Sequence, residues 1–171
     1  VCSSDLNRVV EIIFKPEAIE ALGEGEYVLP VKLADASVSI TGDKAVAILA
    51  PTVIEPMIYF ASSGTSLNLG LGASGVTQNL TIGFNATNTQ NIVCNLAVDA
   101  SYLDTYNATS TVPFELLPES AYTLPSSVTI VEDTREVTAK VALAVSSLPL
   151  GNYLLPVRLS SGQFETRAGN D

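Results

Sequence analysis

The chain has 171 residues, of which 47% are hydrophobic and 15% charged, and this composition is typical of a globular protein rather than a disordered one. Its formal net charge is −10, which argues against nucleic acid and anionic lipid surfaces as partners because both are themselves negative. The chain contains no His, so the commonest general base and metal ligand is missing. No apolar run approaches the roughly 20 residues of a membrane helix, and we expect no transmembrane segment in this sequence.

The first residues, VCSSDL, resemble one reading frame of a sequencing adapter. We therefore interpret residues 1–6 as an artefact of sequence assembly and exclude them from the fold. Cys2 is excluded with them, which leaves Cys94 as the one genuine cysteine and predicts no internal disulfide.

The pattern Tyr-x-Leu-Pro-Val-x-Leu occurs twice, beginning at Tyr27 and at Tyr153, which is a period of 126 residues. In each copy the alternation places Tyr, Leu, Val and Leu on one face of a strand, and Lys32 or Arg158 on the other. Pro30 and Pro156 occupy the same place in the two copies. Because Pro has no N–H to donate to a sheet, both blocks are predicted to be edge strands or bulged strands.

The similarity extends upstream, because RVVEIIF at residues 8–14 precedes the first block much as REVTAKV at residues 135–141 precedes the second. We interpret both segments as strands and the chain as tandem homologous domains. Residues 7–50 are then the C-terminal part of a first β-sandwich, residues 51–56 a linker and residues 57–171 a second β-sandwich. The strand KAVAILA, residues 44–50, has no counterpart after the second block, so we expect the second domain to lack its last strand and to expose a sheet edge.

Three segments of the second domain alternate with period two, as strands with one buried face do. The inward residues are predicted to be Val76, Gln78, Leu80, Ile82 and Phe84 in the first, Ile92, Cys94, Leu96 and Val98 in the second, and Val137, Ala139, Val141, Leu143 and Val145 in the third. Cys94 lies in register with apolar neighbours, which predicts a buried core cysteine rather than a reactive thiol.

The Gly-rich segment GLGASG, residues 70–75, matches a dinucleotide-binding fingerprint. That chemistry needs a helix that begins directly after the glycines, so that its N-terminus faces the pyrophosphate. The following residues, VTQNLTIGF, alternate as a strand, and we therefore predict a hairpin turn and no cofactor.

One segment departs from the strand pattern. Asp99 is a plausible N-cap, and Tyr102 and Tyr106 follow at helical spacing, which predicts a short helix at about residues 99–107 with both rings on one face. Pro-bounded turns then lead into a predicted strand at residues 128–132.

Catalytic and metal-binding motifs are missing from the sequence. It has no Gly-x-Ser-x-Gly elbow, no His to activate a nucleophile and no Asp-rich calcium loop, so we expect no catalytic residues, no metal site and no enzyme activity. Paired carboxylates are the remaining route to catalysis, and solvated strand ends and turns explain them equally well. The carboxylates considered are Asp99, Asp104, Glu115, Glu119, Glu132 and Asp133.

Exposed aromatic rings beside polar groups are the usual basis of sugar recognition, and the sequence offers Tyr102, Tyr106, Phe114 and Tyr122 as candidate glycan contacts. The alternative is that these rings pack the helix onto the sheets. Of the neighbours Tyr59 and Phe60, one is predicted to point inward.

The second half of the chain resembles a known family. The motifs are Val-Asp-x-x-x-Leu-x-x-Tyr-Asn at residues 98–107, Leu-Leu-Pro-Glu at residues 116–119 and Tyr-x-Leu-Pro-Val at residues 153–157. They are similar to the domain of unknown function that occurs, often in tandem, near the N-terminus of surface lipoproteins of Bacteroidetes-type bacteria. The resemblance covers residues 57–162, and residues 8–50 match the second half of a preceding copy.

This resemblance implies an all-β, immunoglobulin-like antiparallel sandwich, located outside the cell and tethered to the outer membrane. Family members precede lectin-like or endo-β-N-acetylglucosaminidase-like domains in polysaccharide utilisation, so adjacent domains of the full-length protein are the expected partners. Three hypotheses follow. The chain is a non-catalytic spacer or scaffold, a glycan-binding module, or an adhesin or pilus-like subunit that a donated strand completes.

Overall fold

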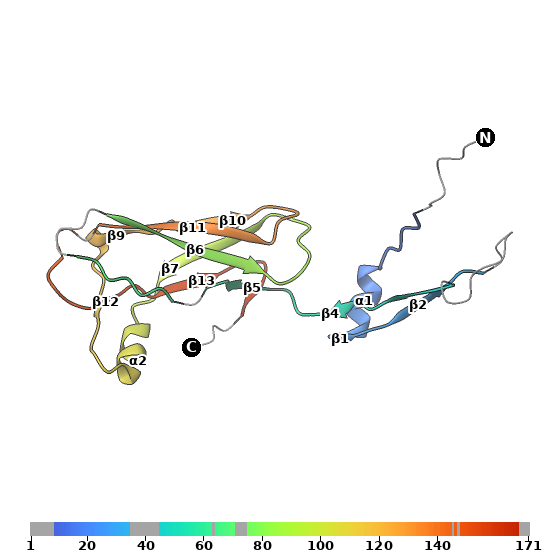
Figure 1. The fold of residues 1–171 in the computed structure, drawn as a ribbon, viewed down its shortest axis with the longest axis horizontal. Coiled ribbons are helices and arrows are strands. Elements are labelled where there is room, and N and C mark those ends of the chain that lie inside the picture. Colours follow the sequence, from blue (N-terminus) through green and yellow to red (C-terminus); the bar gives the residue numbers. More distant parts are fainter. Residues whose placement is uncertain are drawn as a thin grey trace. The chain divides into compact units, whose positions relative to one another are not determined.

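A computed structural model of the chain describes residues 9–34, 45–62, 64–70, 75–144, 146 and 148–167. The chain divides into two compact units, Val1–Glu55 and Pro56–Asp171 (Figure 1). Residues 1–6, interpreted above as an artefact, lie outside the described residues. None of the helices in the described part of the chain is long and apolar enough to span a bilayer.

The first unit contains one long antiparallel hairpin. Its strands are β1 (Gly25–Glu26), β2 (Leu29–Lys32), β3 (Val46–Leu49) and β4 (Thr52–Val53). β1 pairs with β4 and β2 with β3 in one continuous register. Between them, the N–H of Tyr27 donates to the carbonyl of Pro51 over 3.0 Å, and that of Leu33 donates to Ala45 over 2.8 Å. The segment predicted as a linker therefore begins inside this hairpin, since β4 belongs to it.

A short helix, α1 (Pro16–Leu22), lies between the predicted strand at residues 8–14 and this hairpin. The strand prediction is wrong for residues 9–14, which have irregular backbone and exposed side chains. None of the described strands pairs with them, and a strand without a partner leaves its backbone groups unsatisfied. The signals for α1 were present in the sequence. Pro16 stands at the first helical position and Gly23, at φ 73°, follows the last one.

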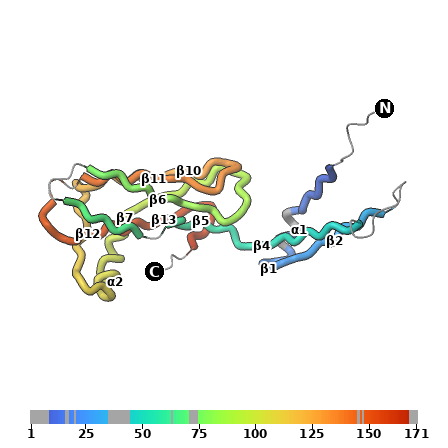
Figure 2. The backbone as a smooth tube through the Cα atoms, viewed as in Figure 1, coloured from blue at the N-terminus to red at the C-terminus, as the bar shows by residue number. Residues whose placement is uncertain are grey.

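The second unit is an all-β, immunoglobulin-like sandwich of two sheets, as predicted. The larger sheet has the order β14 (Glu165–Thr166), β5 (Met57–Phe60), β6 (Val76–Phe84), β11 (Glu136–Leu143), β9 (Tyr122–Thr123). The smaller has the order β10 (Ser127–Ile130), β7 (Ile92–Val98), β13 (Val157–Ser160). A parallel pair, β8 (Glu115–Leu116) with β12 (Tyr153–Leu154), the 3₁₀-helix η2 (Glu119–Ala121) and the helix α2 (Tyr102–Thr109) complete it. Figure 2 traces the path of the backbone.

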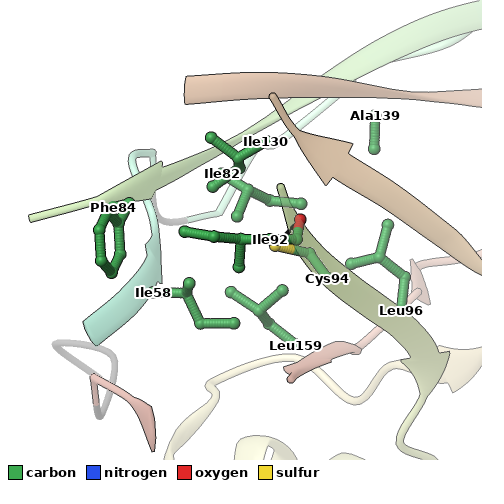
Figure 3. Packing of buried hydrophobic residues seen from close by; sticks show 9 residues of the cluster. All are labelled: Ile58, Ile82, Phe84, Ile92, Cys94, Leu96, Ile130, Ala139 and Leu159. Atoms are coloured by element: carbon green, nitrogen blue, oxygen red, sulfur yellow. Dashed lines mark hydrogen bonds between the residues drawn. The ribbon is translucent and has the colours of Figure 1, made fainter. Parts of the chain in front are cut away.

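The core of the second unit lies between its two sheets (Figure 3). The larger sheet contributes Ile58, Ile82, Phe84 and Ala139, and the smaller contributes Ile92, Cys94, Leu96, Ile130 and Leu159. Their side chains point toward one another from opposite layers in Figure 3. Cys94 is fully buried, as its register predicted, and burial raises the pKa of its thiol because a thiolate would lose its hydration there.

The predicted alternation of β6, β7 and β11 is confirmed. Buried or half-buried positions alternate with exposed ones along most of each strand, and in β6 the inward set ends on the buried Ile82 and Phe84. Val145 and residues 71–74 of the Gly-rich segment lie outside the described residues. β6 begins at Val76, so a strand rather than a helix follows the glycines, and the dinucleotide interpretation has no support. Phe60 packs against the core, whereas Tyr59 lies over Gly83, so one of the two rings points inward.

The predicted helix at residues 99–107 is present but lies further along the chain, at Tyr102–Thr109. Asp99 is not its N-cap, because its backbone N–H donates to the carbonyl of Pro156 over 3.0 Å and thereby continues the pairing of β7 with β13. Ser101 occupies the N-cap position. The strand predicted at residues 128–132 ends at Ile130, where a turn with Asp133 at φ 63° follows.

Both Tyr-x-Leu-Pro-Val blocks are built in the same way at their first residue. The hydroxyl of Tyr27 donates to the carbonyls of Leu22 over 2.6 Å and Gly23 over 3.1 Å, and that of Tyr153 donates to the carbonyl of Pro149 over 3.2 Å. Each ring also lies against the Gly two residues before it, so closely that a Cβ there would come within about 3.4 Å of the ring. The sequence repeat is therefore also a repeat of local structure.

Candidate functional site

An aromatic row lies on the surface of α2. Tyr102 and Tyr106 are four residues apart on the helix, so they share a face, and their ring centroids are 6.4 Å apart. Phe114, in the segment that leads to β8, meets Tyr106 edge to face at 5.3 Å. Tyr102 and Tyr106 are 38% and 37% exposed, which leaves ring surface open to solvent.

The side chain of Asn107 fixes this row. Its Nδ2 donates to the carbonyl of Phe114 over 2.9 Å, and its Oδ1 accepts from the N–H of Phe114 over 2.9 Å. The amide thus makes the same two hydrogen bonds to the backbone of Phe114 that a paired strand would make, and it fixes Phe114 to the last turns of helix α2. The row is therefore held by a polar clamp as well as by ring packing.

Beside the row, a hollow of about 240 Å³ is lined by Asp99, Tyr102, Pro156, Val157 and Arg158. Helix α2 supplies one wall and the start of β13 the other. Nε of Arg158 lies 3.6 Å from Oδ2 of Asp99. The Arg158 side chain is 72% exposed, so this ion pair is largely screened by water and contributes little to stability.

The carboxylate of Asp99 is held by a second group. The hydroxyl of Ser101 donates to its Oδ1 over 2.5 Å. This hydrogen bond, opposed by partial desolvation and aided by the nearby charge of Arg158, lowers the pKa of Asp99 below its ordinary value. Asp99 therefore stays an anion at neutral pH and can accept hydrogen bonds in the hollow.

The other carboxylates considered in the sequence are spread over the unit. Asp104 lies on α2, Glu115 on β8, Glu119 on η2, and Glu132 and Asp133 in the turn after β10. Among the described residues, no group of three His, Cys, Asp or Glu side chains is placed to hold a metal ion.

Residues 54–165 match a family model described as a "-like, N-terminal domain", which is more than half of the chain. The chain belongs to this N-terminal-domain family. It is the Bacteroidetes family that the sequence motifs indicated. No curated protein matches the sequence.

Solved structures from Bacteroides ovatus share the fold of this N-terminal-domain family member. One, described as a "putative carbohydrate binding protein", has a TM-score of 0.60 at 24% identity over 66% of this chain and 34% of its own. A second, of unknown function, has a TM-score of 0.53 at 18% identity over 67% of this chain and 43% of its own. A third, a multidomain protein including DUF1735, has a TM-score of 0.51 at 17% identity over 64% of this chain and 42% of its own. The chain thus spans less than half the length of each.

Of the four aromatic residues predicted from the sequence as glycan contacts, the fold brings three together. Tyr102, Tyr106 and Phe114 form the row on α2, whereas Tyr122 lies on β9 of the larger sheet. Sequence reasoning missed the charged side of the hollow. Asp99 and Arg158 are far apart in the chain and meet only because β7 pairs with β13.

Proposed function

We propose that this chain is a non-catalytic extracellular β-sandwich module that serves as a spacer or scaffold in a surface lipoprotein of polysaccharide utilisation. The observation that supports this role is the repetition of one local construction in both units, Tyr27 with Gly23 and Tyr153 with Pro149. A tandem array of similar modules extends a chain in regular steps. The role of each module is then to contact its neighbours, and it requires no bound ligand. Its partners are then the adjacent domains of the full-length protein, and its anchor is the outer membrane.

The surface location has a direct test. On intact cells of the bacterium that carries the gene, this chain should be cut by added protease and labelled by antibody raised against it. Protection on intact cells, with cleavage after lysis, would place the module inside the cell envelope and overturn the extracellular assignment. A periplasmic protein of the same cells is the control for envelope integrity.

The second candidate function is glycan binding, and the hollow beside α2 favours it. The open faces of Tyr102 and Tyr106 suit the apolar face of a pyranose ring, and Asp99 and Arg158 offer an acceptor and donors for its hydroxyl groups. Arg158 is exposed and held at one point, so it can turn from Asp99 toward a ligand.

One experiment separates the two functions. The chain is applied to an array of host and plant glycans together with the variants Tyr102→Ala and Arg158→Ala. The matched controls are Thr105→Ala, exposed on the same helix, and Lys140→Ala, an exposed cation on β11. Binding that both site variants lose and both controls keep would establish the glycan function and overturn a purely structural role. A folded chain that binds nothing on the array would support the spacer and eliminate the second candidate.

A further inference from the structure

Backbone hydrogen bonds alternate along β13, and this alternation shows which of its residues direct their N–H and C=O groups toward β7. Pro156, directly before β13, accepts the N–H of Asp99 over 3.0 Å, so these two residues are a hydrogen-bonded pair. In an antiparallel ladder such pairs alternate with pairs that exchange no hydrogen bonds. Arg158 and Ser160, which follow Pro156 at steps of two, therefore direct their N–H and C=O groups toward β7.

The residues between them, Val157 and Leu159, direct their N–H and C=O groups to the opposite side. Among the described residues β13 is the outermost strand of its sheet, so no described strand pairs along that side. Upstream the same parity holds, because the carbonyls of Asn152 and Leu154 accept hydrogen bonds from β8 over 2.9 Å each. The edge of β13 that points away from β7 thus belongs to the odd-numbered residues.

The first copy of the repeat shows what pairs with this edge. Leu33 corresponds to Leu159 and Tyr27 to Tyr153, at the period of 126 residues. In the first unit it is these odd-numbered residues that bond to β3, β4 and their flanks, through Leu33 to Ala45 over 2.8 Å and Tyr27 to Pro51 over 3.0 Å. In the second unit the even-numbered residues of the block form hydrogen bonds to a neighbouring strand, whereas in the first unit the odd-numbered residues do so.

We propose that the edge of β13 formed by its odd-numbered residues binds one extended apolar strand of the kind formed by residues 45–53. The bound strand pairs with β13 and so extends the smaller sheet. Superposing the two copies sets its register. The strand runs antiparallel, with its counterpart of Ala45 opposite Leu159 and its counterpart of Ala47 opposite Val157.

The chemistry of this edge fits such a strand. Paired residues of an antiparallel ladder share a face, so the counterparts of Ala45, Ala47 and Leu49 fall on the face of Leu159. Leu159 is 8% exposed and belongs to the core, and Val157 packs against that core. A strand with apolar residues on this face extends the core, whereas a charged side chain there would lose its hydration without a partner.

The decisive measurement is amide hydrogen exchange on the whole chain, before and after KAVAILAPTV is appended to Asp171. The amides of Val157 and Leu159 should exchange fast in the original chain and become protected in the extended one. The amides of Arg158 and Ser160, which face β7, should be protected in both. The melting temperature should rise by several degrees. A general gain in stability would not produce this alternation, so the exchange pattern tests the pairing itself.

A synthetic peptide of the same sequence tests the strand in trans. Methylation of the nitrogen that matches Ala47 removes an N–H directed at β13, and this peptide should lose at least tenfold in affinity. Methylation at the position of Ile48, whose N–H points away, should be tolerated. The two peptides have the same composition, so a difference between them reports the hydrogen-bonding edge alone.

Three results would overturn the proposal. The amides of Val157 and Leu159 could stay unprotected in the extended chain, or the two methylated peptides could bind equally. Protection in the original chain that disappears on dilution would assign the edge to a second copy of the chain instead. None of these results depends on glycan binding, so this proposal and the proposed function can fail separately.

Discussion

The hydroxyl of Tyr153 donates a hydrogen bond to the carbonyl of Pro149, four residues upstream, over 3.2 Å. A Tyr that bonds back to the chain just before its strand is a feature of immunoglobulin-like sandwiches, where it holds the corner into that strand. Tyr27 makes the matching bond in the first unit. The first residue of the repeated block is thus a structural anchor at the entry to the strand.

Removing this hydroxyl should destabilise the second unit. We expect Tyr153→Phe to lower the free energy of unfolding by about 0.5–1.5 kcal/mol, because one hydrogen bond is lost while the ring packing is kept. Tyr122→Phe is the control, since the Tyr122 hydroxyl has no hydrogen-bond partner among the described residues. Urea denaturation at neutral pH measures both, and equal midpoints would contradict the anchoring role.

Gly83 is required by the ring of Tyr59. A Cβ on Gly83 would lie 2.7 Å from Cζ and 2.8 Å from the hydroxyl oxygen of that ring. Gly83→Ala should therefore cost about 1–3 kcal/mol of stability, and the cost should shrink in a Tyr59→Ala background, where the ring nearest to the new Cβ is gone. Gly162→Ala, with open space around its Cβ, should change stability by less than about 0.5 kcal/mol. Additive costs in the double variant would refute this account.

Among the described residues of the second unit, Asn88 is the buried polar one, at 3% exposure. Its Nδ2 donates to the carbonyls of Val131 over 2.8 Å and Thr134 over 3.0 Å and so closes the turn between β10 and β11. Asn88→Ala removes both hydrogen bonds and leaves the carbonyl of Val131 with its donors from Thr134 alone, and it should cost about 1–3 kcal/mol in thermal or urea unfolding. Asn95→Ala, exposed on β7, should be nearly neutral, and a similar loss in both variants would argue against a specific role for Asn88.

The carboxyl of Asp99 should titrate below the ordinary Asp value of about 3.9. Its pKa is lower in the folded chain than in the unfolded one, so the carboxylate stabilises the fold above the unfolded value, and this contribution is lost as the pH falls through the folded value. Ser101→Ala should move the pKa back up and weaken the acid dependence. Carboxyl NMR titration reads this shift, with Ser120→Ala as the control. An unchanged midpoint in Ser101→Ala would show that the hydroxyl is not the cause.

Local patterns in the sequence were sufficient for much of the fold. Period-two alternation identified the inward faces of β6, β7 and β11 because one face of each strand packs in the core and the other faces water. The same alternation placed Cys94 in the core. The predicted strand at residues 8–14 failed for the complementary reason. A strand needs a second strand to pair with as well as an alternating pattern, and none of the described strands pairs with residues 9–14.

The amino-acid sequence was enough to identify the fold class, the repeat and the family, because each depends on residues that are neighbours in the chain or recur at a constant period. Tertiary structure alone decided the rest. Asp99 and Arg158 meet across two strands that are distant in the chain, and Tyr122 separates from the other three rings because it lies on β9 of the larger sheet, whereas they lie on α2 and in the segment before β8. The register of strand pairing decides which of these residues meet. Register depends on contacts between segments rather than on the order of residues within a single segment.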